Sequence, residues 1–199
     1  MKVPAERVFR ISRRSGGACR SSILPSLRRS TRTAKIASRR RAGLLREQRA
    51  AYRIALPGPL YCDTSALLKL YVSEPGSDDF NRVVERREDV LVSDLVVTEV
   101  TSALARRLRQ GTGTLEAARR MQHSILERLD GGGYQRVELT RAVHRRAEQF
   151  LLSLTEIPLR AADALHLALA ASGRALSMAS FDGRLRRAAR AAGLLTYPA

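Results

Sequence analysis

Aromatic side chains are scarce in this sequence, which has no tryptophan, four phenylalanines and five tyrosines in 199 residues. A protein that holds single-stranded nucleic acid by stacking needs several aromatic rings along its binding groove. The composition therefore does not indicate a base-stacking platform.

Cysteine is also rare, and Cys19 and Cys62 lie far apart in the sequence. Neither belongs to a CxxC pair or to a Cys/His spacing of the kind that binds zinc. This pattern argues against a disulfide framework and against a zinc site, and a reducing compartment is expected.

Long hydrophobic runs are absent. No run approaches the roughly 18 apolar residues needed to cross a bilayer, and the first residues lack the compact apolar core of a secretory signal. We therefore expect no membrane partner and a cytoplasmic location. Because there is also no internal repeat, one globular domain is expected.

Positive charge is abundant but unevenly divided. Residues 1–56 contain 16 Lys and Arg and two acids, a net charge of +14, whereas the remaining 20 Lys and Arg and 17 acids leave only +3. The isoelectric point of about 11.4 thus describes mainly the N-terminal segment, and the rest of the chain is not strongly basic.

Residues 1–57 form a basic extension that is expected to be disordered, because the segment is rich in Arg, Ser and Ala and lacks sustained apolar periodicity. Three interpretations remain open: a nucleic-acid-binding arm, an organelle transit peptide, and translated sequence upstream of the true start. The last is favoured. Pro57-Gly58-Pro59 then interrupts the chain, and residues 58–199 are expected to form the folded domain.

From residue 60 onward, short apolar runs alternate with segments of helical periodicity. The expected strands are residues 60–62, 90–92, 137–139, 175–180 and 194–197. The expected helices are residues 65–71, one that follows Ser77 or Asp78 with Ser77 as a candidate cap, and residues 95–109, 114–129, 141–152, 160–171 and 183–192. This alternation predicts a three-layer α/β/α fold with a mainly parallel five-stranded sheet, in which the functional crevice lies at the carboxyl ends of the strands.

Four acidic residues fall where these strands end or helices begin: Asp63, Glu99, Asp163 and Asp182. Taken singly, each could be a helix cap or a partner of a helix dipole. Gathered at one edge of the sheet, they would repel one another and require a cation. A divalent ion held by carboxylates, in a chain rich in arginine, indicates phosphate chemistry on a nucleic acid.

The segments around these acids resemble the PIN-domain family. They are Tyr61-Cys62-Asp63-Thr64-Ser65-Ala66-Leu67, Thr98-Glu99, Arg160-Ala161-Ala162-Asp163-Ala164-Leu165-His166-Leu167-Ala168 and Ser180-Phe181-Asp182. Their order and spacing match from about residue 59 to the C-terminus. Within the family, the sequence is most similar to the VapC-type toxins of prokaryotic toxin–antitoxin pairs.

This resemblance implies a metal-dependent endoribonuclease whose acidic quartet, Asp63, Glu99, Asp163 and Asp182, binds one or two Mg²⁺ or Mn²⁺ ions. Ser65 and Ser180 match small hydroxyl positions that hold metal-bound water or a neighbouring carboxylate. No histidine base is needed, because the metal lowers the pKa of its own water. The resemblance also implies an RNA substrate, a cognate antitoxin protein and a homodimer.

Other polar residues have two open interpretations. Arg160 precedes Asp163 by one turn and either borders the crevice or pairs with an acid there. Further arginines either follow an RNA backbone or form solvated helix faces: Arg106, Arg107, Arg109, Arg119, Arg120, Arg186, Arg187 and Arg190. His166 is expected to be a packed residue that orients its neighbours, and His123 and His144 are expected at the surface.

Two alternatives to an RNA-cleaving toxin remain open. The first is a PIN-like domain that binds RNA or protein without turnover, and the second is a structure-specific DNA nuclease. The complete acidic quartet favours catalysis.

Overall fold

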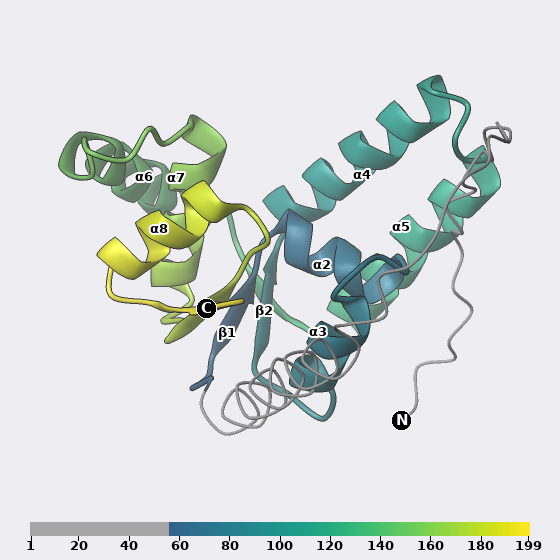
Figure 1. The fold of residues 1–199 in the computed structure, drawn as a ribbon, viewed down its shortest axis with the longest axis horizontal. Coiled ribbons are helices and arrows are strands. Elements are labelled where there is room, and N and C mark those ends of the chain that lie inside the picture. The colour runs from purple at the N-terminus through teal and green to yellow at the C-terminus, as the bar shows by residue number, and fades with distance from the viewer. Residues whose placement is uncertain (1–55) are drawn as a thin grey trace, which may run out of the picture. The chain divides into compact units, whose positions relative to one another are not determined.

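The structure is a computed structural model that describes residues 56–199. The predictions about the basic extension lie outside the described residues. Over the described range, five strands and seven helices follow one another in the order shown in Figure 1. Residues 56–199 include no helix that is long and apolar enough to cross a membrane.

All five strands are parallel and form one sheet in the order β3-β2-β1-β4-β5. The prediction of a five-stranded, mainly parallel sheet is confirmed. The strands are β1 (Leu60–Cys62), β2 (Val90–Ser93), β3 (Gln135–Val137), β4 (Ser177–Ala179) and β5 (Leu195–Tyr197). Every residue of β1, β2 and β4 is buried, as expected for parallel strands covered on both faces.

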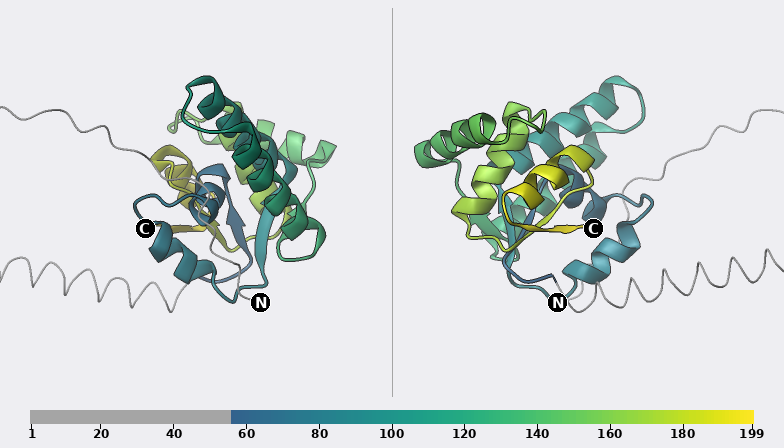
Figure 2. Two further views of the ribbon diagram at one scale, coloured as in Figure 1. Left: turned by 90° about the vertical axis from the view of Figure 1, so that its right-hand side faces the viewer. Right: turned by 60° about the vertical axis from the view of Figure 1, so that its left-hand side comes forward.

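The helices lie in two groups on opposite faces of the sheet, which accounts for the three layers (Figure 1). One group is α2 (Thr64–Tyr71), α3 (Ser77–Val84), α4 (Asp94–Arg109) and α5 (Leu115–Asp130). The other is α6 (Arg141–Ser153), α7 (Ala161–Ser172) and α8 (Gly183–Ala191), and the right-hand view of Figure 2 shows these three together. Crossover connections between parallel strands are right-handed. The chain moves across the sheet in one direction from β1 through β2 to β3 and in the opposite direction from β3 through β4 to β5. The helices of the two halves therefore lie on opposite faces.

Side-chain caps fix where several helices begin. Ser93, Thr114 and Thr140 each accept a hydrogen bond from a backbone amide in the first turn of α4, α5 and α6, which satisfies donors that the helix itself leaves unpaired. Asp63 and Asp182 do the same for α2 and α8. Two of the four acids singled out in the sequence are therefore helix caps as well.

Two sequence predictions are corrected at element ends. The third strand ends at Val137, and Leu139 is 38% exposed, because β3 is an edge strand whose alternation continues beyond its hydrogen bonds. Ser77 is the first residue of α3 rather than its cap, and Gly76 holds the cap position with a φ of 88°. The Ser77 hydroxyl instead donates to the carbonyl of Val72, at 2.7 Å.

Candidate active site

The candidate site lies at the carboxyl end of β1 and β4, in the centre of the sheet. The strand order reverses between these two adjacent strands, because β2 follows β1 on one side and β5 follows β4 on the other. Crevices at such switch points are the usual ligand sites of open parallel sheets. Asp63 follows β1 directly, and its amide donates to the Ala179 carbonyl at the end of β4, at 3.1 Å.

Asp63 is buried, with 3% of its surface exposed. Its Oδ1 accepts from the Ser65 hydroxyl and the Ala66 amide, both at 2.8 Å, and its Oδ2 accepts from the Ser180 hydroxyl at 2.6 Å. Burial raises the pKa of the Asp63 carboxyl above its ordinary value, although nearby His166 and these hydrogen bonds oppose the shift. Among residues 56–199, the groups that donate hydrogen bonds to Asp63 are two hydroxyls and a backbone amide, and none of them is charged.

Glu99 lies in the second turn of α4 and is held by residues from two other elements. His166 Nε2 is 2.8 Å from Glu99 Oε2, and the Thr64 hydroxyl donates to the same oxygen. Burial raises the pKa of Glu99, but the hydrogen bonds from His166 and Thr64 outweigh it and leave the pKa below its ordinary value. Glu99 is therefore ionised at neutral pH.

His166 links Glu99 to Tyr61 and, through Tyr61, to Ser93 by hydrogen bonds. Its Nδ1 is 2.9 Å from the Tyr61 hydroxyl, which is 3.1 Å from the Ser93 hydroxyl. Burial raises the pKa of Tyr61, so its hydroxyl keeps its proton. Since the Glu99 carboxylate can only accept, Nε2 carries the proton that points to it. The prediction that His166 is packed and orients its neighbours is confirmed, and His123 and His144 are exposed as predicted.

Asp163 and Asp182 share one guanidinium group. Arg184 Nε donates to Asp163 Oδ2 at 2.9 Å, and an Arg184 NH₂ nitrogen lies 3.5 Å from Asp182 Oδ2. Asp163 Oδ2 also accepts from the backbone amide of Arg160 at 2.9 Å. Asp182 Oδ1 accepts from the amides of Arg184 and Leu185 at the start of α8.

Arg184 was not among the residues predicted for the site. Arg160, which was expected to border the crevice or pair with an acid, contacts Asp163 through its backbone amide, and the guanidinium on Asp163 belongs to Arg184. One feature of the sequence could have identified it. A basic residue in the first turn of a helix opposes the helix dipole, and residues that break a local rule often mark functional positions.

The Ser65 and Ser180 hydroxyls lie beside Asp63. Ser65 and Ser180 both donate to the carboxylate of Asp63, and Ser180 also accepts from the Asp182 amide at 3.1 Å. Ser180 therefore joins the end of β1 to the start of α8. Several of the other arginines are engaged structurally: Arg107 with Glu74, Arg120 with Glu116, Arg186 with the Ser180 carbonyl and Arg190 with Thr196.

The donor set suits a hard divalent cation, because carboxylates, hydroxyls and backbone carbonyls are the ligands that Mg²⁺ and Mn²⁺ prefer. In the part of the chain from residue 56 to 199, however, no three acidic, histidine or cysteine side chains form a group that could hold a metal ion. Each carboxylate is directed at its own protein donors instead. The assignment of the four acids as ligands of one ion stays a prediction.

Among residues 56–199, two oxygens of the four acids accept no hydrogen bond, Glu99 Oε1 and Asp163 Oδ1. Asp163 Oδ1 accepts no hydrogen bond from any residue between 56 and 199, whereas Oδ2 of the same carboxylate accepts two. A carboxylate held on one oxygen and open on the other is oriented to bind a cation. The ligand types of these side chains therefore fit a divalent ion, and in this structure the guanidinium of Arg184 contacts two of them, Asp163 and Asp182.

Three comparisons relate the chain to known proteins. A family model described as PIN domain matches residues 60–191. The sequence is 33% identical over 141 residues to ribonuclease VapC46 of Mycobacterium tuberculosis, covering 68% of this chain and 93% of that protein. The fold is similar to the crystal structure of VapC20, a sarcin–ricin-loop-cleaving toxin of the same organism, with a TM-score of 0.53 and 20% identity over 68% of this chain and 96% of that one.

Proposed function

This chain belongs to the PIN-domain family, and we propose that it is a metal-dependent endoribonuclease that acts as the toxin of a toxin–antitoxin pair. The proposal is supported by a relative that is itself named a ribonuclease and that aligns over 93% of its length. It is supported independently by the position of Asp63, Asp163 and Asp182 beside the switch point of the sheet.

In this proposal, Asp63, Glu99, Asp163 and Asp182 hold Mg²⁺ or Mn²⁺. A bound ion of this kind lowers the pKa of its water and stabilises negative charge on a reacting phosphate. The chain's own residues keep the ligands in place: Ser65 and Ser180 orient Asp63, and His166 orients Glu99. Exposed arginines near the site, Arg160 among them, would contact RNA phosphates.

The remaining parts of the proposal concern partners and location. We propose a cognate antitoxin protein that holds the nuclease inactive, a homodimer, and action in the cytoplasm, where the RNA substrate is. The nuclease domain would comprise residues 58–199, which agrees with a family match that begins at residue 60. Residues 1–57 would be an extension outside the nuclease domain.

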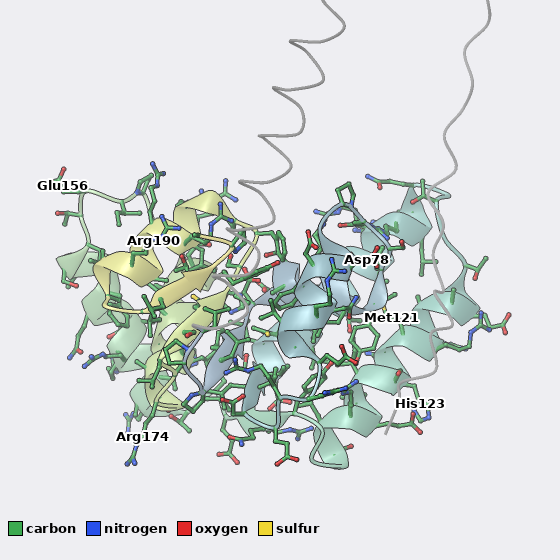
Figure 3. The ribbon with its side chains drawn as sticks, turned by 60° about the horizontal axis from the view of Figure 1, so that its bottom comes forward. Asp78, Met121, His123, Glu156, Arg174 and Arg190 are labelled. Carbon is green, nitrogen blue, oxygen red and sulfur yellow. The ribbon has the colours of Figure 1, made fainter. Side chains whose placement is uncertain are left out.

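The test uses the purified full-length chain with a structured RNA and with a DNA of the same sequence. We expect cleavage of the RNA in Mg²⁺ or Mn²⁺, no cleavage in EDTA, and loss of cleavage in Asp63→Asn. Glu156→Gln is the matched control, because Glu156 is exposed and lies at the periphery of the fold (Figure 3).

Each contrary result selects an alternative. Cleavage of the DNA but not the RNA would assign the chain as a DNA nuclease. RNA binding without cleavage under all metal conditions would assign it as a non-catalytic member of the fold. Cleavage that persists in Asp63→Asn would remove the acidic cluster from the mechanism.

A further inference from the structure

Arg184 is placed so that one side chain neutralises two of the four acids. Its guanidinium lies between Asp163 and Asp182, at 2.9 Å from an oxygen of the first and 3.5 Å from an oxygen of the second. The side chain of Asp163 is 11% exposed and that of Arg184 is 22% exposed. The contact is therefore partly shielded from water, where ion pairs are stronger than at an open surface.

The backbone fixes this arrangement. Asp182 Oδ1 accepts from the amides of Arg184 and Leu185, which directs Oδ2 towards the guanidinium of the same Arg184. Asp163 Oδ2 is held by the Arg160 amide as well. The starts of α7 and α8 thus each present one carboxylate oxygen to Arg184. The positive charge of Arg184 opposes the dipole of α8, and these two carboxylates hold it in place.

Among residues 56–199, the other two acids do not have such a partner. The hydrogen-bond donors to Asp63 there are hydroxyls and a backbone amide, and Glu99 contacts His166 and Thr64. Within residues 56–199, Arg184 is the only Lys or Arg that forms an ion pair with any of the four acids. A permanent positive charge has therefore been placed where the proposed function requires a divalent ion.

We propose that Arg184 is an internal competitor of the divalent ion, and that metal binding requires its guanidinium to leave Asp163 and Asp182. This inference rests on the proposed function. A divalent ion and a guanidinium repel each other, and both require the same carboxylate charge. Arg184 has a long flexible side chain that can move to solvent, whereas the carboxylates are held by backbone amides. Arg184 consequently weakens metal binding and raises the metal concentration that the enzyme needs.

The test measures Mn²⁺ binding directly, by the electron paramagnetic resonance signal of free Mn²⁺ in titrations of the full-length chain. Removing a competing charge from a partly buried site should strengthen binding by roughly five- to tenfold in Arg184→Met. Arg184→Lys, which keeps the charge, should remain within about twofold of the parent chain. The matched control is Arg187→Met, which removes the same charge from an exposed position on the same helix and should change binding by less than about twofold.

Arg184→Gln keeps hydrogen-bonding capacity without charge, and it decides the question if Arg184→Met does not fold by circular dichroism. Mn²⁺ binding that is unchanged or weaker in the folded neutral variant would overturn the inference. So would equal strengthening by Arg187→Met, because the effect would then come from net charge alone.

Failure of the inference can be told apart from failure of the proposed function. If the parent chain binds Mn²⁺ and Asp163→Asn binds it more weakly, the metal site exists, and an unchanged Arg184→Met overturns only the role of Arg184. If neither the parent chain nor Arg184→Met binds Mn²⁺, both are wrong. The Mn²⁺ concentration for half-maximal RNA cleavage should shift in the same direction as the binding constant.

Discussion

The two sides of the acidic cluster balance their negative charge in different ways. At the end of β1, Asp63 is 3% exposed, and its hydrogen-bond donors within residues 56–199 are hydroxyls and a backbone amide. At the starts of α7 and α8, Asp163 and Asp182 are more exposed and share the guanidinium of Arg184. Neutral donors stabilise a buried carboxylate less than a cation does, so the described residues compensate the charge of Asp63 less fully than those of Asp163 and Asp182.

The two sides are nevertheless connected. The Ser180 hydroxyl donates to the Asp63 carboxylate and accepts from the Asp182 amide, so one buried hydroxyl joins Asp63 to the backbone at the start of α8. The two sides therefore balance their charge within one hydrogen-bonded network.

The largest expected difference is in catalysis. Asp63→Asn should reduce RNA cleavage by at least about 100-fold, whereas Asp182→Asn should reduce it by about tenfold, since removal of a buried charged group from a reaction site has the greater effect. Asparagine preserves both helix caps, so circular dichroism spectra should be unchanged. Initial rates at saturating Mg²⁺ measure the difference. If Asp182→Asn reduces RNA cleavage more than Asp63→Asn does, the expectation that the buried acid matters more for catalysis is wrong.

The next largest effect concerns Glu99. His166→Ala should lower the free energy of unfolding by about 1–3 kcal/mol, because it leaves the Tyr61 hydroxyl without its buried partner and removes a hydrogen bond from Glu99. His166→Gln should recover part of the loss. Urea unfolding measures both, and His144→Ala, at an exposed position, should stay within about 0.5 kcal/mol of the parent chain. Equal effects of the two alanine variants would contradict the role given to His166.

A smaller effect is expected in the pH dependence of stability without divalent ions. The pKa of Asp63 is raised in the folded protein, so the folded state holds this proton over a range where the unfolded state has lost it. Stability from this group is therefore greatest at acidic pH and falls as pH rises from about 4 through the folded pKa, with a slope of at most about 1.4 kcal/mol per pH unit.

Asp63→Asn removes that titration. The melting temperature of the parent chain should fall relative to the variant as pH rises, and the difference should level off above the folded pKa. Thermal melts in EDTA between about pH 4 and pH 8 measure it. A difference that stays constant across this range would show that burial does not penalise the Asp63 charge.

The smallest effect is expected for the hydroxyl that joins the two sides. Ser180→Ala should cost about 1 kcal/mol of stability, because it removes one hydrogen bond from Asp63 and leaves the Asp182 amide without its acceptor. The matched control is Ser153→Ala at an exposed position, with an expected change below about 0.5 kcal/mol. Calorimetry or urea titration can compare them, and equal values would remove Ser180 as a link.

Much of the fold could be predicted from the sequence, because parallel strands and amphipathic helices leave separate local patterns. The alternation from Leu60 to Tyr197 predicted the elements with boundary shifts of a few residues. Leu139 was placed in a strand because alternation continues where hydrogen bonding stops, and only the neighbouring strand decides that. Positions at strand ends similarly predicted that Asp63 and Asp182 share one edge of the sheet.

The partners of the acids could not be predicted in the same way. Arg160 was favoured because it lies one turn from Asp163 in sequence, yet Arg184, 21 residues away, makes the ion pair. Sequence distance determines contacts within one helix, but contacts between two helix starts depend on how both pack on the sheet.

The sequence alone determined the order of strands and helices, the acids at their ends and the uneven charge, because these follow from local periodicity and composition. Only the tertiary structure decided how each charge is balanced. Packing buried Asp63 among hydroxyls and brought Arg184 onto Asp163 and Asp182, because a hydrogen bond or ion pair depends on distances of a few ångströms between segments that meet only in the folded chain.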